Sequence, residues 1–153
     1  MEALHPRIRL LWIGQAGLFA IALGVVLAGV DTWLLTLPSV APIGVVVSGL
    51  LLGTLYTLVR YRKWRFRLEE DALYLERGVL TFVETSVPFV RVQHVDTQFG
   101  PIERTLGLSS VVVYTAGSRN ADVRVPGLTP TRARRLQNTL RDLAVESETD
   151  DGV

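Results

Sequence analysis

The sequence predicts a membrane-spanning α-helical hairpin followed by a mainly-β domain that ends in one helix. Two long uncharged apolar stretches lie between Leu10 and Val59. Directly after Val59 the apolar residues change to a period of two, which is typical of strands. An amphipathic segment with helix-start signals then begins near Thr129. Since the chain has 153 residues, it leaves room for one folded domain beside the hairpin.

The two apolar stretches have the length of membrane crossings. Residues 10–30 carry no charged side chain and would extend roughly 31 Å as a helix, about the thickness of a hydrocarbon core. A second uncharged stretch covers about residues 40–59. A secretory signal is the first alternative, but its small-residue motif, Ala20-Ile21-Ala22, lies inside the first stretch instead of after it. A pair of buried helices is the second, but the rest of the chain is too small to cover both.

Charged residues at the helix ends predict the orientation of the hairpin. Arg7 and Arg9 precede the first crossing, and the turn between the crossings carries only Asp31. Five cations follow the second crossing, and we call them the basic collar: Arg60, Arg62, Lys63, Arg65 and Arg67. Cations gather on the cytoplasmic side of short loops. We therefore expect a multi-pass protein of the cell membrane with both termini in the cytoplasm.

Small residues recur at every fourth position of both crossings, a spacing that lets helix backbones approach closely in lipid. They are Ala16, Ala20, Gly24 and Ala28 in the first helix, and Gly49 and Gly53 in the second. The two stripes could close the hairpin on itself or form a dimer face. Because a short connection favours contact between neighbouring helices, we expect the first arrangement.

The domain that follows is predicted to be an antiparallel β structure capped by a helix. Lys63, Arg65 and Arg67 alternate with three large apolar residues, which places the cations on one face of a strand. Further strands are predicted for residues 73–75, 81–87, 90–99, 108–115 and 121–126. Thr129 and Pro130 begin the last helix as its cap and first residue. We therefore divide the chain into an N-terminal lead with the hairpin (1–62), the folded domain (63–145) and an acidic, disordered tail (146–153).

Several runs of the domain resemble one family. They are residues 70–80 (EDALYLERGVL), 87–96 (VPFVRVQHVD), 100–108 (GPIERTLGL), 114–117 (YTAG) and 125–128 (VPGL). Together with the preceding hairpin, these runs are similar to the membrane-flanked bacterial pleckstrin-homology-like (PH-like) domains of the YdbS type. The resemblance implies two small packed sheets that form a pleckstrin-type barrel closed by the helix from Pro130. It implies neither an enzymatic activity nor an established ligand.

The densest polar set of the domain lies inside these runs and consists of Arg91, Gln93, His94 and Asp96. His94 and Asp96 suggest an acid-base or metal site. Neighbouring strand residues point to opposite faces, however, and a single His without a second His or Cys is a poor ligand set. We therefore expect these residues to satisfy strand and turn groups. The chain has no cysteine, and we predict no catalytic residues, no metal and no cofactor.

The remaining function classes differ in what the domain would bind. A net charge of +1 does not make the basic surface that nucleic-acid binding needs. A channel is disfavoured because neither crossing contains a charged residue. We expect a membrane-anchored interaction or scaffold module that faces the cytoplasm and binds another membrane protein or its own copy. The alternative is a sensor of anionic lipid headgroups that uses the basic collar.

Overall fold

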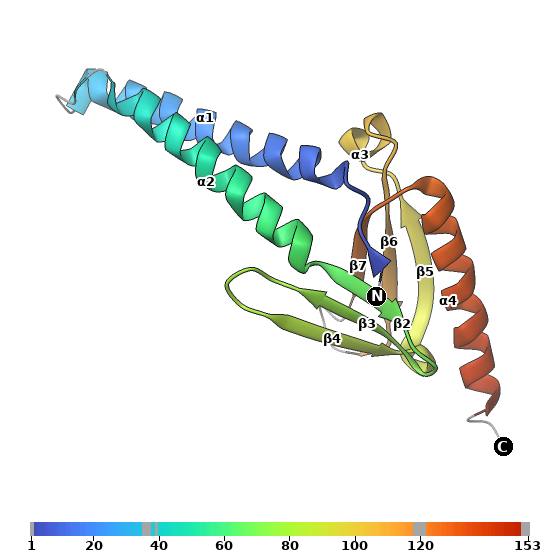
Figure 1. Cartoon of the computed structure of the whole chain (residues 1–153). Helices are drawn as coiled ribbons and strands as arrows, with labels where there is room; N and C mark the ends of the chain where they lie inside the picture. The colour runs from blue at the N-terminus through green and yellow to red at the C-terminus, as the bar shows by residue number, and fades with distance from the viewer. Residues whose placement is uncertain (1, 35–37, 39, 118–121, 151–153) are drawn as a thin grey trace. The chain divides into compact units, whose positions relative to one another are not determined.

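The computed structural model of the chain describes residues 2–34, 38, 40–117 and 122–150 (Figure 1). The side chains of residues 31–34, 148 and 150 are not described. The chain forms two compact units. Residues 9–61 make one of them, and residues 1–8 together with 62–153 make the other. The lead therefore belongs to the folded domain, where we had predicted it as part of the hairpin.

The first unit is a helical hairpin. Helix α1 spans Ile8–Leu34 and helix α2 spans Ala41–Lys63. Segments Ile8–Val30 and Ala41–Lys63 are long and apolar enough to cross a membrane. Both helices extend beyond the uncharged stretches, because Asp31 and Thr32 after the first and Arg60 to Lys63 after the second cost a helix only fractions of a kcal/mol each. Residues 35–37 and 39 of the predicted turn lie outside the described part of the chain.

The second unit contains two open antiparallel sheets. The first sheet has the order β1-β2-β3-β4, with strands Glu2–Ala3, Arg65–Leu68, Ala72–Arg77 and Val83–Pro88. The second has the order β5-β6-β7, with strands Val92–Gln98, Ser109–Thr115 and Val123–Leu128. The short helices η1 (Phe89–Arg91) and α3 (Pro101–Thr105) lie in the connections before and after β5. The two open sheets and the terminal helix confirm the predicted PH-like fold of two small sheets capped by a helix, and each sheet is a separate hydrogen-bond ladder.

The core of this unit lies on the inner faces of the sheets and under the last helix. Alternation along β5 and β6 directs Val95, Val111 and Val113 inward, and all three are fully buried. Helix α4 (Pro130–Asp150) packs against η1, β5 and β6. Gln137 of α4 links it to β5, because its Nε2 donates a 2.7 Å hydrogen bond to the backbone oxygen of Val95. The cap is as predicted, with Thr129 Oγ1 accepting from the amide of Arg132.

Helix α4 continues beyond the predicted start of the tail. It ends at Asp150, so the prediction of disorder from residue 146 onward is wrong up to that residue. Ser147 and Thr149 bond back to carbonyl oxygens of the preceding turn, at 2.8 Å each. Residues 151–153 lie outside the described part of the chain. Acidic composition therefore did not prevent helix formation here, because Glu is a good helix former.

The lead is the part of the fold that the sequence analysis missed. Strand β1 pairs with β2, with Glu2 opposite Phe66 and Ala3 opposite Arg65. The amide of His5 donates a 2.7 Å hydrogen bond to the carbonyl oxygen of Gly127, at the end of β7. Leu4 is also fully buried in this unit. The residues before α1 therefore complete the first sheet and hold it to the second.

Candidate functional site

The cations of the basic collar are divided between the two compact units. Arg60 belongs to the hairpin unit, where its guanidinium lies 4.1 Å from the ring centroid of Trp12. Arg62 is exposed at the start of the other unit. The ammonium of Lys63 donates a 3.2 Å hydrogen bond to the backbone oxygen of Val79. Arg60 and Lys63 therefore make different local contacts, each within its own unit.

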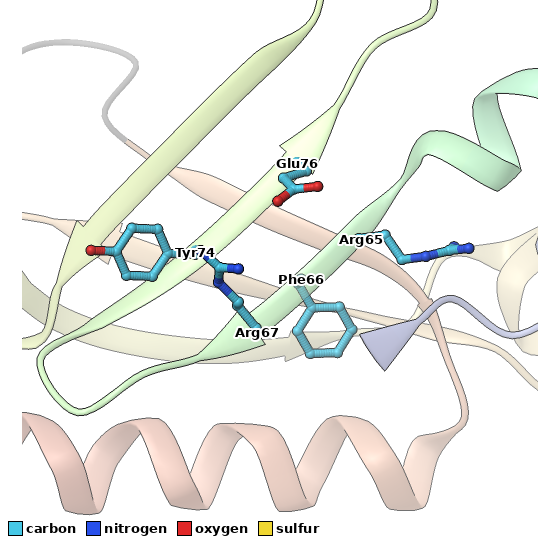
Figure 2. A pocket seen from close by; sticks show the side chains of 5 residues that line it. All are labelled: Arg65, Phe66, Arg67, Tyr74 and Glu76. Carbon is cyan, nitrogen blue, oxygen red and sulfur yellow. The ribbon is translucent and has the colours of Figure 1, made fainter. Parts of the chain in front are cut away.

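Arg65 and Arg67 do share the outer face of the first sheet, as the period of two predicted. Strand pairing places Arg65 opposite Glu76 and Arg67 opposite Tyr74 (Figure 2). The guanidinium of Arg67 lies 5.2 Å from the Tyr74 ring centroid. Its Nε is 2.7 Å from a carboxylate oxygen of Glu69. The hollow among these side chains is too small for a water molecule, so this face offers paired charges and no headgroup pocket.

A larger hollow of about 280 Å³ lies between the first sheet and α4. Its lining is mostly apolar with two arginines at the rim: Glu2, Phe66, Leu68, Leu128, Arg132, Arg135, Leu136 and Thr139. Arg132 is held by Glu2, since its Nη2 lies 2.6 Å from the Glu2 carboxylate. The volume lies at the lower end of the range of small-molecule sites, which begins near roughly 300 Å³.

The polar set of β5 is arranged differently from our prediction. His94 and Asp96 are two residues apart and so share one face, with His94 Nε2 and Asp96 Oδ2 at 4.0 Å. The expectation that they point to opposite faces was wrong, because it applied the alternation of adjacent residues to a pair separated by one. Gln93 lies at an irregularity between the paired residues Val92 and His94, and Arg91 lies in η1. Only His94 and Asp96 of the four come together.

Strand pairing brings further residues to this outer face, which sequence spacing could not have indicated. His94 lies opposite Tyr114 of β6, and the two rings stack at 4.1 Å between centroids with 17° between their planes. Gln98, two residues beyond Asp96, has its Nε2 3.4 Å from the Tyr114 hydroxyl. Val112, opposite Asp96, occupies the middle of the same face. We call this surface the β5-β6 face: His94, Asp96, Gln98, Val112 and Tyr114.

A buried carboxylate lies at the edge of the β5-β6 face. Glu103 of α3 is only 6% exposed, and its oxygens accept hydrogen bonds from the amide of Gly100 at 3.0 Å and from the hydroxyl of Ser110 at 2.5 Å. Arg124 of β7 lies 3.4 Å from the same carboxylate. Sequence analysis missed Glu103 as a functional residue, although it lies within one of the family runs. The contacts fix α3 against the end of the second sheet.

No metal centre is evident at these sites. Within residues 2–34, 38, 40–117 and 122–150, no three His, Asp or Glu side chains converge so that they could hold a metal ion. The His94–Asp96 pair is exposed, with the His94 side chain 58% accessible. A solvated pair of this kind lacks the buried, oriented third group that acid-base sites use.

Two comparisons with known proteins agree with this architecture. A family model described as "Bacterial PH domain" matches residues 8–144. A curated relative, the "UPF0699 transmembrane protein YdbS" of Bacillus subtilis (strain 168), is 34% identical over 112 residues, which cover 70% of this chain and 69% of the relative. No solved structure matches significantly. With its two apolar helices and this transmembrane relative, the protein is a membrane protein. The chain therefore belongs to the bacterial PH domain family.

Proposed function

We propose that this protein is a membrane-anchored interaction module without enzymatic activity, and that its PH-like domain binds another membrane protein or a second copy of the chain through the β5-β6 face. The observation that carries the proposal is the stack of the exposed His94 on the half-buried Tyr114, with rings 4.1 Å apart. Aromatic side chains are enriched in protein interfaces. A stack that already exists in the free domain also lowers the entropy lost on binding.

Neighbouring residues support the same role. Val112 lies in the middle of the face but is only 8% exposed, so a partner would meet the polar and aromatic side chains around it. Asp96 and Gln98 lie on the same face and are exposed. Aromatic residues beside polar ones are common in protein-binding surfaces. We further propose that the domain and both termini lie in the cytoplasm, because cations flank both helices on the domain's side.

A photo-crosslinking residue at Gln98 in the full-length protein tests this proposal in living cells. We expect adducts to one partner protein or to a second copy, and we expect His94→Ala and Tyr114→Ala to reduce them. The matched control carries the same crosslinker at Arg134, an exposed residue of α4. Adducts of equal yield from Gln98 and Arg134, or adducts at Gln98 that neither alanine variant reduces, would reject the β5-β6 face as the binding surface.

The rival proposal, recognition of an anionic headgroup by the collar, has weaker support. Arg65 faces Glu76 and Arg67 is paired with Glu69, so acidic neighbours already offset much of the positive charge. Nanodiscs of mixed anionic lipids provide a test with the full chain. We expect Arg65→Gln/Arg67→Gln to retain the same headgroup classes as the natural chain when bound lipids are identified by mass spectrometry. Selective loss of one headgroup would favour the lipid-sensor alternative.

A further inference from the structure

We propose that the loop between β3 and β4 inserts its apolar side chains into the surface of the lipid bilayer, as a contact separate from the two helices. We call residues 78–83 the apolar loop. This contact goes beyond the proposed function, because it concerns how the domain meets lipid and not which partner it binds. Three properties of the loop support it: exposed apolar side chains, a turn that requires glycine, and a hydrogen bond to the last residue of α2.

The apolar loop exposes large hydrophobic side chains next to one another. Leu80 is 95% exposed, Phe82 is 59% exposed and Val83 is 38% exposed. Residues 78–83 include no charged side chain. Single exposed apolar residues are common on soluble surfaces, whereas adjacent ones mark contacts with a partner or a membrane. The loop therefore presents an apolar tip that its own unit leaves uncovered.

The turn of the apolar loop requires glycine at position 78. Its φ angle is +111°, a conformation that other residues rarely adopt. A Cβ atom at this position would also overlap the backbone oxygen of Thr81. A larger residue at position 78 would therefore change the path of the backbone that leaves Leu80 and Phe82 exposed.

One contact within the domain attaches the loop to the point where the chain leaves the membrane. The Nζ of Lys63 donates a 3.2 Å hydrogen bond to the carbonyl oxygen of Val79. Lys63 is the last residue of α2, whose apolar span is Ala41–Lys63. Lysine side chains at the ends of such spans extend their ammonium groups to the polar boundary of the bilayer. Val79, and the adjacent Leu80, are therefore held at that boundary.

These observations select lipid as the occupant. The bilayer is present wherever the hairpin is inserted, and Lys63 connects the loop directly to its surface. Leu and Phe side chains are favourable at the boundary between headgroups and acyl chains. The contact requires no anionic lipid, because residues 78–83 carry no cation. A protein partner or a second copy would instead cover the loop only when that molecule is present.

Fluorescence quenching in the full-length protein tests the insertion. The chain has no cysteine, so Leu80→Cys and Phe82→Cys each give a single site for a polarity-sensitive dye. The variants are placed in phosphatidylcholine vesicles whose acyl chains carry bromine near the headgroup. We expect quenching at both sites to exceed severalfold that of Ser86→Cys, an exposed control position on β4. High salt should leave the difference unchanged, since charge plays no part.

Two further measurements distinguish insertion into lipid from contact with another protein and from an effect of the dye. Phe82→Asp, combined with the dye at position 80, should reduce quenching, because a charged residue resists entry into the bilayer. Quenching should not change when the ratio of protein to lipid in the vesicles is lowered. Equal quenching at positions 80 and 86 would overturn the proposal. If the dye is shielded from water only when the ratio of protein to lipid is high, the proposal is overturned in favour of contact with a second copy.

Discussion

The hydroxyl of Ser110 donates a 2.5 Å hydrogen bond to the buried carboxylate of Glu103. Ser110 itself is fully buried, so neither group can exchange this bond for one to water. The same carboxylate accepts from the amide of Gly100 at 3.0 Å. Glu103 is thus a single side chain that joins the start of α3 to β6, and its loss affects one fully buried donor and one half-buried donor at once.

Replacing Glu103 should therefore destabilise the domain. Glu103→Ala leaves the hydroxyl of Ser110 and the amide of Gly100 without an acceptor, at a cost of about 1–3 kcal/mol for a buried unsatisfied group. Thermal unfolding of the full chain in detergent measures this loss. The control is Glu84→Ala, since Glu84 is exposed on β4. Equal unfolding temperatures for the two variants would mean that solvent satisfies the donors.

A larger residue at Gly53 should loosen the hairpin. A Cβ atom there would lie 2.7 Å from the Cβ of Ala16, and one at Gly49 would lie 2.9 Å from the Cβ of Ala20. Gly24 likewise approaches Val46, whereas Ala28 is exposed. Five of the six small residues of the two stripes thus lie at the contact between α1 and α2.

We expect Gly53→Leu to lower stability by about 1–3 kcal/mol, as overpacking usually does, without changing the oligomeric state in detergent. Gly44→Leu is the matched control, because no atom lies within 4 Å of the Cβ that Gly44 would carry. Unfolding in denaturing detergent and light scattering measure the two properties. A dimer that dissociates while the monomer stays equally stable would support the intermolecular alternative.

Acid should weaken the attachment of the lead. Burial lowers the pKa of His5 below its ordinary value of 6.5, and the positive charges of Arg7 and Arg132 lower it further. Its Nδ1 accepts a 3.2 Å hydrogen bond from the amide of Arg7, which protonation would remove. Below pH 6.5 the unfolded chain binds a proton that the folded chain resists. The contribution of neutral His5 to stability is therefore complete above that pH and is lost as the pH falls.

Hydrogen exchange at the amide of His5, corrected for the intrinsic dependence on pH, reports this change directly, because that amide bonds to Gly127. We expect protection to stay constant above about pH 6.5, the ordinary histidine pKa, and to fall as the pH drops below that value. His5→Gln removes the titration and should make protection independent of pH in this range. The same loss of protection in His5→Gln would assign the effect to other groups.

The proposed orientation predicts which side of the membrane each turn occupies. In a chain without cysteine, Val40→Cys precedes α2 and Ala116→Cys follows β6, and both positions are exposed. We expect a membrane-impermeant thiol reagent to label Val40→Cys on intact cells. It should label Ala116→Cys only after the cells are permeabilised. Labelling of Ala116→Cys alone on intact cells would show that the orientation is inverted.

Strong local patterns made much of the fold predictable from the sequence. The apolar runs indicated the hairpin through their length, and the alternation from Lys63 to Leu68 indicated β2. Strand β1 gave no such signal, because two residues show no period and their partners, Arg65 and Phe66, lie beyond the whole hairpin. Elements of this kind depend on tertiary pairing, which local propensity does not encode.

The candidate site was predictable only in part, for a related reason. His94 and Asp96 stood out as polar residues in one strand, but Tyr114 joins them through the register of β5 with β6. A bulge precedes His94 in that register, and its position is not visible in the residue pattern. Glu103 resembled an ordinary surface acid, since helices as short as α3 do not show which side will be buried. The pairing of β5 with β6 and the burial of Glu103 could be established only from the structure.

Strand β1 makes correct membrane insertion a condition for completing the domain. Glu2 leaves the ribosome long before its partner Phe66, and two membrane crossings are synthesised between them. If only one helix inserted across the bilayer, β1 and β2 would be on opposite sides and the first sheet would lack its edge strand. Leu4 and the start of β2 would then stay open to solvent. Chains with the wrong number of crossings should therefore be cleaved more readily by proteases, because β1 can pair with β2 only when both ends of the hairpin lie on the same side of the membrane.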